Sequence, residues 1–187
     1  MQLKIYQISH PIVQIISNNI ENNTTDKVRD EIYYRSIGFL VLYEMFRKSL
    51  VIKNLYIKNI EDLKILNVVD KNVKYVILTN LLENQCLISE VKLILPEIEI
   101  AHIEYEDPDN VLKQMKDLNQ KYNNTKIFIV EKTTKDDRIT YIIDYLRKKE
   151  YVSVSNISLG NIISNSTALE QIGRKYPEIN VYTTKVL

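Results

Sequence analysis

The sequence predicts an α/β fold: a single-domain, parallel, twisted sheet with flanking helices, preceded by an N-terminal helix and a hairpin arm. From about residue 73, short continuous apolar runs recur, which is typical of strands covered on both faces of a parallel sheet. Segments with apolar residues at helical spacing separate these runs, and such alternation implies right-handed crossovers. The 187 residues suit one core, so we assign 1–187 to one domain, with the helix and arm in 1–60 and the parallel core in 73–187.

The N-terminal part predicts one long helix followed by an extended arm. Apolar residues at spacings of three, four or seven predict a helix from about Thr25 to Lys48 with one buried stripe. The stripe consists of Val28, Ile32, Phe39, Tyr43 and Phe46. Residues 50–60 alternate loosely between apolar and polar, as a half-exposed strand or hairpin arm does. Because such arms often contact another subunit, a homodimer through residues 50–60 is an open expectation.

The core is predicted to alternate strands and helices up to the C-terminus. Strands are expected at 73–79, 98–105, 126–131, 151–159 and 179–183. Apolar positions on one helical face predict helices over 111–122 and 139–146, the latter with basic residues at its end to match the macrodipole. The string Thr167-Ala-Leu-Glu170 predicts a capping box at the start of the last helix.

Composition excludes several classes of partner. Lys and Arg total 25 against 24 Asp and Glu, so no overall field attracts nucleic acid or an anionic membrane. The longest apolar run, residues 37–43, is far shorter than the ~20 residues of a membrane span. The first residues lack the layout of a secretory signal. We therefore expect no nucleic-acid partner and no membrane span, and the abundance of Asn, Ile, Lys and Tyr indicates an AT-rich genome such as that of a plastid or a reduced bacterium.

Isolated Cys, His and Tyr residues each allow two interpretations. Cys86 lies in a helical apolar pattern, which favours a small buried hydrophobe over a reactive thiol. His10 and His102 lack a second ligand at metal spacing, so packed or capping histidines are favoured over a metal site. The pair Tyr33 and Tyr34 either stacks on a base, marks a partner surface or packs half-buried, and we favour packing.

The acidic residues Glu104, Glu106, Asp107 and Asp109 follow a predicted strand, at the end where α/β sheets bind ligands. They would suit Mg²⁺, but a solvated acidic loop is the favoured interpretation. The sequence contains no nucleophile elbow, Walker loop, paired cysteines or zinc spacing. We therefore assign no catalytic residue, no cofactor and no metal site.

Short strings along the chain occur in the order found in one enzyme family. They are His10-Pro11, Ile-Gly-Phe-Leu-Val-Leu-Tyr-Glu at 37–44, Leu95-Pro96 with Ile-Ala-His-Ile at 100–103, and the segment 168–183. Through these strings the chain resembles a uracil phosphoribosyltransferase, a type I phosphoribosyltransferase, closest to cyanobacterial and plastid members, over essentially its whole length. The resemblance implies the phosphoribosyltransferase fold and, in an intact enzyme, formation of UMP from uracil and phosphoribosyl pyrophosphate.

The family's phosphate-binding loop resembles Asp-Pro-x-Leu-Ala-Thr-Gly-Gly-Thr, whose small residues let backbone amides wrap an anion at a helix N-terminus. A gapless alignment places Glu131-Lys-Thr-Thr-Lys-Asp-Asp-Arg-Ile139 there, without a glycine. At ~4 Å, Asp136 and Asp137 would each repel a phosphate by several kcal/mol, and Lys135 and Arg138 would offset only part of that. Glu131, Asp136, Asp137, Arg138 and Ile139 are therefore interpreted as vestigial phosphate-loop positions.

The family's pyrophosphate-binding residues are also replaced. Its first arginine aligns with Leu82, the following glycine with Asn84 and its second arginine with Asp107. The sequence ends at Leu187, before the family's uracil-recognising segment Pro-Gly-Leu-Gly-Asp-Ala-Gly-Asp. These joint losses predict a non-catalytic homologue.

We therefore expect a binding or scaffold subunit of a larger assembly with protein partners. If the source is an alga, the expected location is the plastid stroma or the stromal face of the thylakoid, with photosynthetic complexes as partners; otherwise it is the cytoplasm. One alternative is a residual uracil phosphoribosyltransferase that still makes UMP. Another is a sensor in which the remnant cleft binds a different nucleotide.

Overall fold

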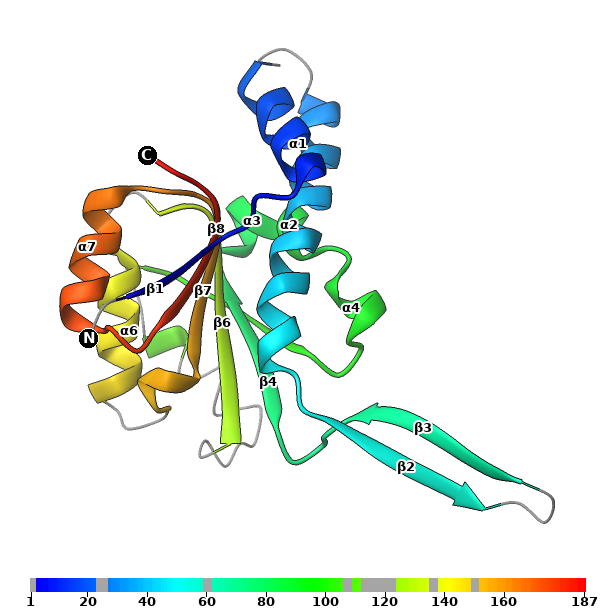
Figure 1. Ribbon diagram of the computed structural model, residues 1–187. Helices are drawn as coiled ribbons and strands as arrows, with labels where there is room; N and C mark the ends of the chain where they lie inside the picture. Colours follow the sequence, from blue (N-terminus) through cyan, green and yellow to red (C-terminus); the bar gives the residue numbers. More distant parts are fainter. Residues whose placement is uncertain are drawn as a thin grey trace.

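A computed structural model describes residues 3–22, 27–58, 62–105, 109–111, 124–134, 138–148 and 152–187. Its strands are β1 (Lys4–Gln7), β2 (Ile52–Lys58), β3 (Leu63–Val69), β4 (Lys74–Thr79), β5 (Glu99–His102), β6 (Thr125–Thr134), β7 (Ile157–Ser164) and β8 (Asn180–Val186). Its helices are α1 (Pro11–Asn22), α2 (Lys27–Ser49), α3 (Leu81–Ile88), α4 (Val91–Ile94), α6 (Arg138–Lys148) and α7 (Ser166–Lys175), with a 3₁₀ turn, η2 (Val154–Asn156). The predicted α/β class is confirmed (Figure 1).

The main sheet has the strand order β1-β8-β7-β6-β4-β5, and every neighbouring pair is parallel. Its interior strands β4 and β6 pair in register from Lys74 with Thr125 to Leu78 with Ile129. Both strands are buried on both faces over most of their length. This double burial explains why they read as continuous apolar runs in the sequence.

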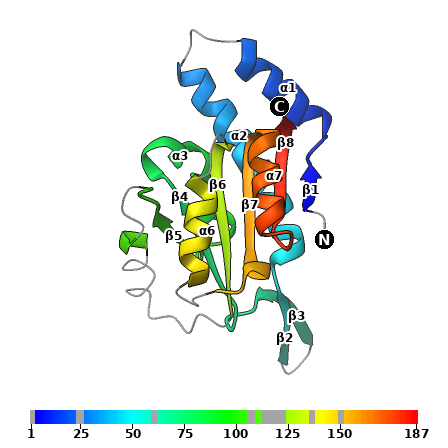
Figure 2. The ribbon, with the colours of Figure 1, turned by 90° about the vertical axis from the view of Figure 1, so that its left-hand side faces the viewer.

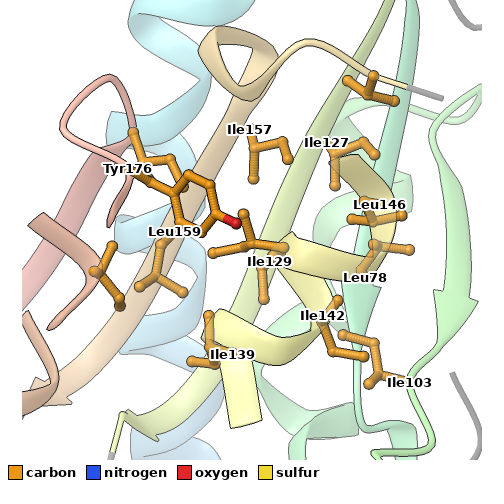
Figure 3. Close-up of a cluster of buried hydrophobic side chains, with 14 of the residues drawn as sticks. Leu78, Ile103, Ile127, Ile129, Ile139, Ile142, Leu146, Ile157, Leu159 and Tyr176 are labelled. Carbon is orange, nitrogen blue, oxygen red and sulfur yellow. The ribbon is translucent and has the colours of Figure 1, made fainter. Parts of the chain in front are cut away.

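Helices α6 and α7 cover one face of the sheet (Figure 2). The predicted apolar face of α6, made of Ile139, Ile142, Ile143 and Leu146, is buried there. Figure 3 shows three of these side chains against isoleucines of β6 and β7. Full burial of each such side chain contributes about 1.5–3 kcal/mol, so the helix is held mainly by this packing.

Helices α1, α2, α3 and α4 lie on the opposite face (Figure 1). The long helix α2 confirms the predicted element, but the predicted stripe is wrong because Val28, Ile32 and Tyr43 are exposed. The buried positions of α2 are Ile37, Val41, Leu42, Met45 and Phe46. They all lie between the middle and the C-terminal end of the helix, which also contacts β7 and β8.

Helix α2 approaches α3 closely at Gly38. A Cβ atom added at Gly38 would lie 2.4 Å from the backbone oxygen of Leu87 and 2.6 Å from its Cα. No side chain fits between two backbones at that separation. The side of α2 that faces inward is therefore fixed by this contact and not by the most regular apolar spacing.

The strand expected at 151–159 is displaced, because β7 runs from Ile157 to Ser164 and η2 precedes it. Gly160 lies inside β7, where an added Cβ would meet the Met45 sulfur at 2.3 Å. The predicted capping box is also wrong. Helix α7 begins at Ser166, and the Asn165 side chain accepts a hydrogen bond from the Thr167 amide at 2.8 Å.

Two N-terminal elements are additional to the prediction. Strand β1 extends the sheet by pairing with β8 from Lys4–Asn180 to Gln7–Thr183. Helix α1 starts at Pro11, and the ring nitrogen Nδ1 of His10 accepts a hydrogen bond from the Ile12 amide at 3.2 Å. A proline in the first turn after a capping side chain is a common helix start.

The predicted arm is a β-hairpin. Strands β2 and β3 pair antiparallel from Ile52–Val69 to Lys58–Leu63, and Figure 1 shows the hairpin projecting away from the sheet. Every residue of β2 is exposed. Of the helix expected at 111–122, all residues after Val111 lie outside the described part of the chain. Among the described residues, no helix has both the length and the apolar character needed to cross a membrane.

Candidate functional site

A polar cleft of about 580 Å³ opens at the carboxyl ends of β4 and β6. The chain leaves β4 into α3 on one face of the sheet and leaves β6 toward α6 on the other. Adjacent parallel strands whose connections diverge in this way form a topological switch point, where α/β proteins bind ligands. The cleft therefore lies where the fold would place an active site.

The cleft brings together five of the predicted site residues. Leu82 and Asn84 lie at the start of α3, Glu131 lies on β6, and Arg138 and Ile139 begin α6. The remaining predicted positions, Asp107, Asp136 and Asp137, lie outside the described residues.

Glu131 lies in strand β6, as predicted, but the strand continues past this residue, which was its predicted end. Strand β6 continues through Thr134, because Glu131, Thr133 and Thr134 pair with β7. The Glu131 side chain points into the cleft wall and the residue is only 5% exposed. Residues 135–137, between β6 and α6, lie outside the described part of the chain.

The Glu131 carboxylate accepts hydrogen bonds from three segments of the chain. The Asn84 side-chain amide donates to Oε2 at 2.6 Å, and the Tyr105 hydroxyl donates to Oε1 at 2.5 Å. The Asn80 backbone amide donates to Oε1 at 3.5 Å. Burial raises the pKa of Glu131 above its ordinary value, although these hydrogen bonds oppose the shift.

Asn84 joins α3 to β6. It is 1% exposed, and its Oδ1 accepts a hydrogen bond from the Lys132 amide at 3.2 Å while its Nδ2 donates to Glu131. A glycine at this position, as in the family pattern, would have neither group. The side chain therefore fills space that the family pattern leaves open.

The backbone amides at the start of α3 all have partners within the chain. The Asn80 amide donates to Glu131, and the Leu81 amide donates to His102 Nδ1 at 3.0 Å. The Leu82 amide donates to Asn80 Oδ1 at 3.1 Å, and the amides of Glu83 and Asn84 donate to the Asn80 carbonyl. These are the donors that an anion at a helix N-terminus would need.

His102 and His10 both accept hydrogen bonds from amides at helix starts, which confirms the capping interpretation of both histidines. Tyr34 is half-buried against the α2 core, which supports packing as its role. Cys86 is partly buried against the same core. Among the described residues, no group of three His, Cys, Asp or Glu side chains is placed to hold a metal ion.

Two cations among the described residues of the cleft lie over aromatic rings. The Lys132 ammonium is 4.7 Å from the Tyr34 ring centre, and the Arg138 guanidinium carbon is 5.8 Å from that of Tyr105. Leu82, at the family's arginine position, is 89% exposed on the rim, whereas Ile139 is buried in the core. The cleft thus has basic residues, but its most buried charged group is a carboxylate.

Sequence reasoning missed Asn80, His102 and Tyr105 as members of this site. Tyr105 and Glu131 are 26 residues apart, and Asn84 and Glu131 are 47 apart. No spacing in the sequence indicates such contacts, since they depend on which strands become neighbours. A polar residue directly after a buried strand, as Asn80 is after β4, was the one available signal.

Comparison with known proteins decides the family, because the family model described as uracil phosphoribosyltransferase matches residues 7–186. The chain belongs to the uracil phosphoribosyltransferase family. Two relatives, from the red algae Porphyra purpurea and Pyropia yezoensis, are each named uracil phosphoribosyltransferase homolog. They are 27% and 26% identical over 187 residues, which is all of this chain and 89% of each relative.

The fold of this uracil phosphoribosyltransferase family member is similar to that of the AQ2163 protein from Aquifex aeolicus. The TM-score is 0.70 at 12% identity, over 97% of this chain and 86% of that structure. At this identity the likeness shows the fold alone.

Proposed function

We propose that this member of the uracil phosphoribosyltransferase family is non-catalytic and serves as a binding or scaffold subunit of a protein assembly. The observation that carries the proposal is the occupied start of α3, where the family pattern places the pyrophosphate loop. Each backbone amide from Asn80 to Asn84 already donates to a group of the chain itself. A sugar diphosphate would find no free amide there.

Electrostatics support the same proposal. Glu131 places a carboxylate at the amides that would meet the pyrophosphate. At ~4 Å and intermediate dielectric, two like charges repel by about 4 kcal/mol. Lys132 and Arg138 offset part of this repulsion, but they do not free the amides.

The binding role is supported by the β2–β3 hairpin. Isolated two-stranded hairpins are marginal in water, and they gain stability only from packing against something else. This hairpin exposes Ile52, Leu55, Tyr56, Leu63 and Ile65 by half or more. Ile52, Tyr56, Leu63 and Ile65 belong to one face of the hairpin and Leu55 to the other. Large apolar side chains exposed together on one face are typical of an interaction surface.

We place the assembly in a plastid if the source is an alga, either in the stroma or on the stromal face of the thylakoid, and in the cytoplasm otherwise. The two relatives from red algae support the plastid setting. Purification of the tagged protein from its native source under mild conditions, followed by mass spectrometry, tests the assembly. Recovery of the protein alone would contradict it.

Isothermal titration with phosphoribosyl pyrophosphate and Mg²⁺ tests the loss of ligand binding. We expect no saturable heat up to millimolar ligand. Micromolar binding would overturn the proposal.

The second candidate function is residual synthesis of UMP from uracil and phosphoribosyl pyrophosphate. Family membership and the position of the cleft at the switch point favour it. An assay for UMP at high enzyme concentration separates the two functions. Turnover that Leu82→Arg increases would favour the residual enzyme.

A further inference from the structure

We propose that the Glu131 side chain is a tethered ligand: its carboxylate fills a site of converging donors that would otherwise take a small carboxylate from solution. The donors are the Asn80 backbone amide, the Asn84 side-chain amide and the Tyr105 hydroxyl. The inference rests on the proposed non-catalytic function and identifies what occupies the remnant site.

The donors are oriented by the rest of the chain. Asn84 Oδ1 accepts from the Lys132 amide, so Nδ2 must face Glu131. The Asn80 amide is fixed by the helix start, because the Asn80 carbonyl accepts from the amides of Glu83 and Asn84. Two of the three donors therefore keep their direction if the Glu131 side chain is removed. Buried donors without an acceptor are costly, so such a site favours an acceptor from solution.

The charge and volume of the cleft favour a small anion in a variant without this carboxylate. Among the residues that the structure describes, Lys132, Arg138, Glu83 and Glu131 line the cleft. Truncation of Glu131 to alanine removes one negative charge from this set. The cleft holds about 580 Å³ and adjoins the carboxylate, so formate or acetate has a path to the donors.

The test is the melting temperature of Glu131→Ala in sodium formate, with sodium chloride at equal ionic strength as reference. We expect saturating formate to raise the melting temperature of the variant by roughly 5 °C relative to chloride. Wild-type protein should show no formate-specific gain. Glu83→Ala is the matched control, since it removes a charge from the cleft without emptying the donor site, and it should also respond equally to both salts.

If Glu131→Ala does not fold in chloride, refolding in formate should recover it. A second measurement uses a variant that retains the carboxylate: Tyr105→Phe removes one donor and should raise the titration midpoint of the Glu131 carboxyl, followed by ¹³C NMR. Equal responses of Glu131→Ala to formate and chloride, or an unmoved titration in Tyr105→Phe, would overturn the inference. Binding of phosphoribosyl pyrophosphate to wild-type protein would instead overturn the proposed function, so the two failures are distinguishable.

Discussion

At the residue scale, Glu131 gives the protein a pH-dependent stability. Burial raises its pKa above the ordinary value of 4.5, so the folded state favours the protonated form more than the unfolded state does. The contribution of Glu131 to the free energy of unfolding is fully present below pH 4.5 and is lost as the pH rises through the folded-state pKa. Tyr105 and Asn84 lower the shift by donating, whereas Glu83 adds to it by repulsion.

We therefore predict that Glu131→Gln becomes more stable relative to wild type as pH rises from about 4.5 toward neutrality. The amide does not ionise, and its oxygen still accepts from Asn84 while its nitrogen donates to the Tyr105 hydroxyl. Urea unfolding at several pH values in this range measures the difference. A stability difference that narrows toward neutral pH would show that the folded state favours the ionised carboxylate.

Leu82→Arg restores the family's arginine on the rim of the cleft. Because Leu82 is 89% exposed, we expect the free energy of unfolding to change by no more than ~0.5 kcal/mol. We also expect no binding of phosphoribosyl pyrophosphate, since the amides at the start of α3 remain engaged. Chemical unfolding measures the stability of the variant, and calorimetric titration measures its binding of phosphoribosyl pyrophosphate. Tight binding of this ligand by the single variant would mean that the arginine was the main missing element.

At the scale of elements, the contact of α2 with α3 depends on Gly38. We predict that Gly38→Ala destabilises the protein by roughly 2 kcal/mol, because the new methyl group meets the Leu87 backbone, which cannot rotate away. Gly173→Ala in α7 is the matched control. Its Cβ would lie 3.1 Å from the Leu3 side chain, so helix propensity should make it neutral or stabilising by up to ~1 kcal/mol. Urea unfolding compares both variants with wild type, and equal effects would contradict the close contact.

Elements that form because of the pattern of their own residues were predictable from the sequence. Elements that depend on contacts with distant segments of the chain were not. Helix α6 has its apolar residues on one face, and the interior strands β4 and β6 are continuous apolar runs. By contrast, β1 is short and mostly exposed and exists only because β8 lies beside it. The displacement of β7 also involves a distant contact, since the predicted strand stopped before Gly160, whereas β7 continues through Gly160 and Met45 packs over it.

The candidate site was predictable in location but not in its contacts. The carboxyl ends of neighbouring strands meet at one edge, so alignment to the family pattern identified Asn84 and Glu131 as site positions. The hydrogen bond between them depends on how α3 sits against β6, which one sequence does not specify. The predicted end of the strand at Glu131 was wrong because pairing with β7 extends β6 through a polar segment to Thr134.

At the scale of the whole molecule, the exposed apolar side chains of the hairpin indicate a binding partner. A second copy of the chain is the simplest such partner. One face of the hairpin presents the cross-strand pairs Ile52–Val69 and Tyr56–Ile65. Tyr56 is 61% exposed, and buried tyrosines frequently dominate the binding energy of interfaces. We predict a homodimer that Tyr56→Ala weakens by at least ~10-fold, measured by analytical ultracentrifugation over a concentration series.

The two faces of the hairpin supply the control for this prediction. Leu55 pairs with Leu66 on the opposite face, so Leu55→Ala removes similar apolar area without touching the Tyr56 face. Because a contact on one face leaves the other in solvent, Tyr56→Ala should lower self-association strongly and Leu55→Ala should not. Equal loss in both would mean that the hairpin is enclosed on both sides or unfolds as a unit, and circular dichroism distinguishes these. A wild-type monomer at all concentrations would exclude the homodimer and leave the apolar hairpin for a different protein.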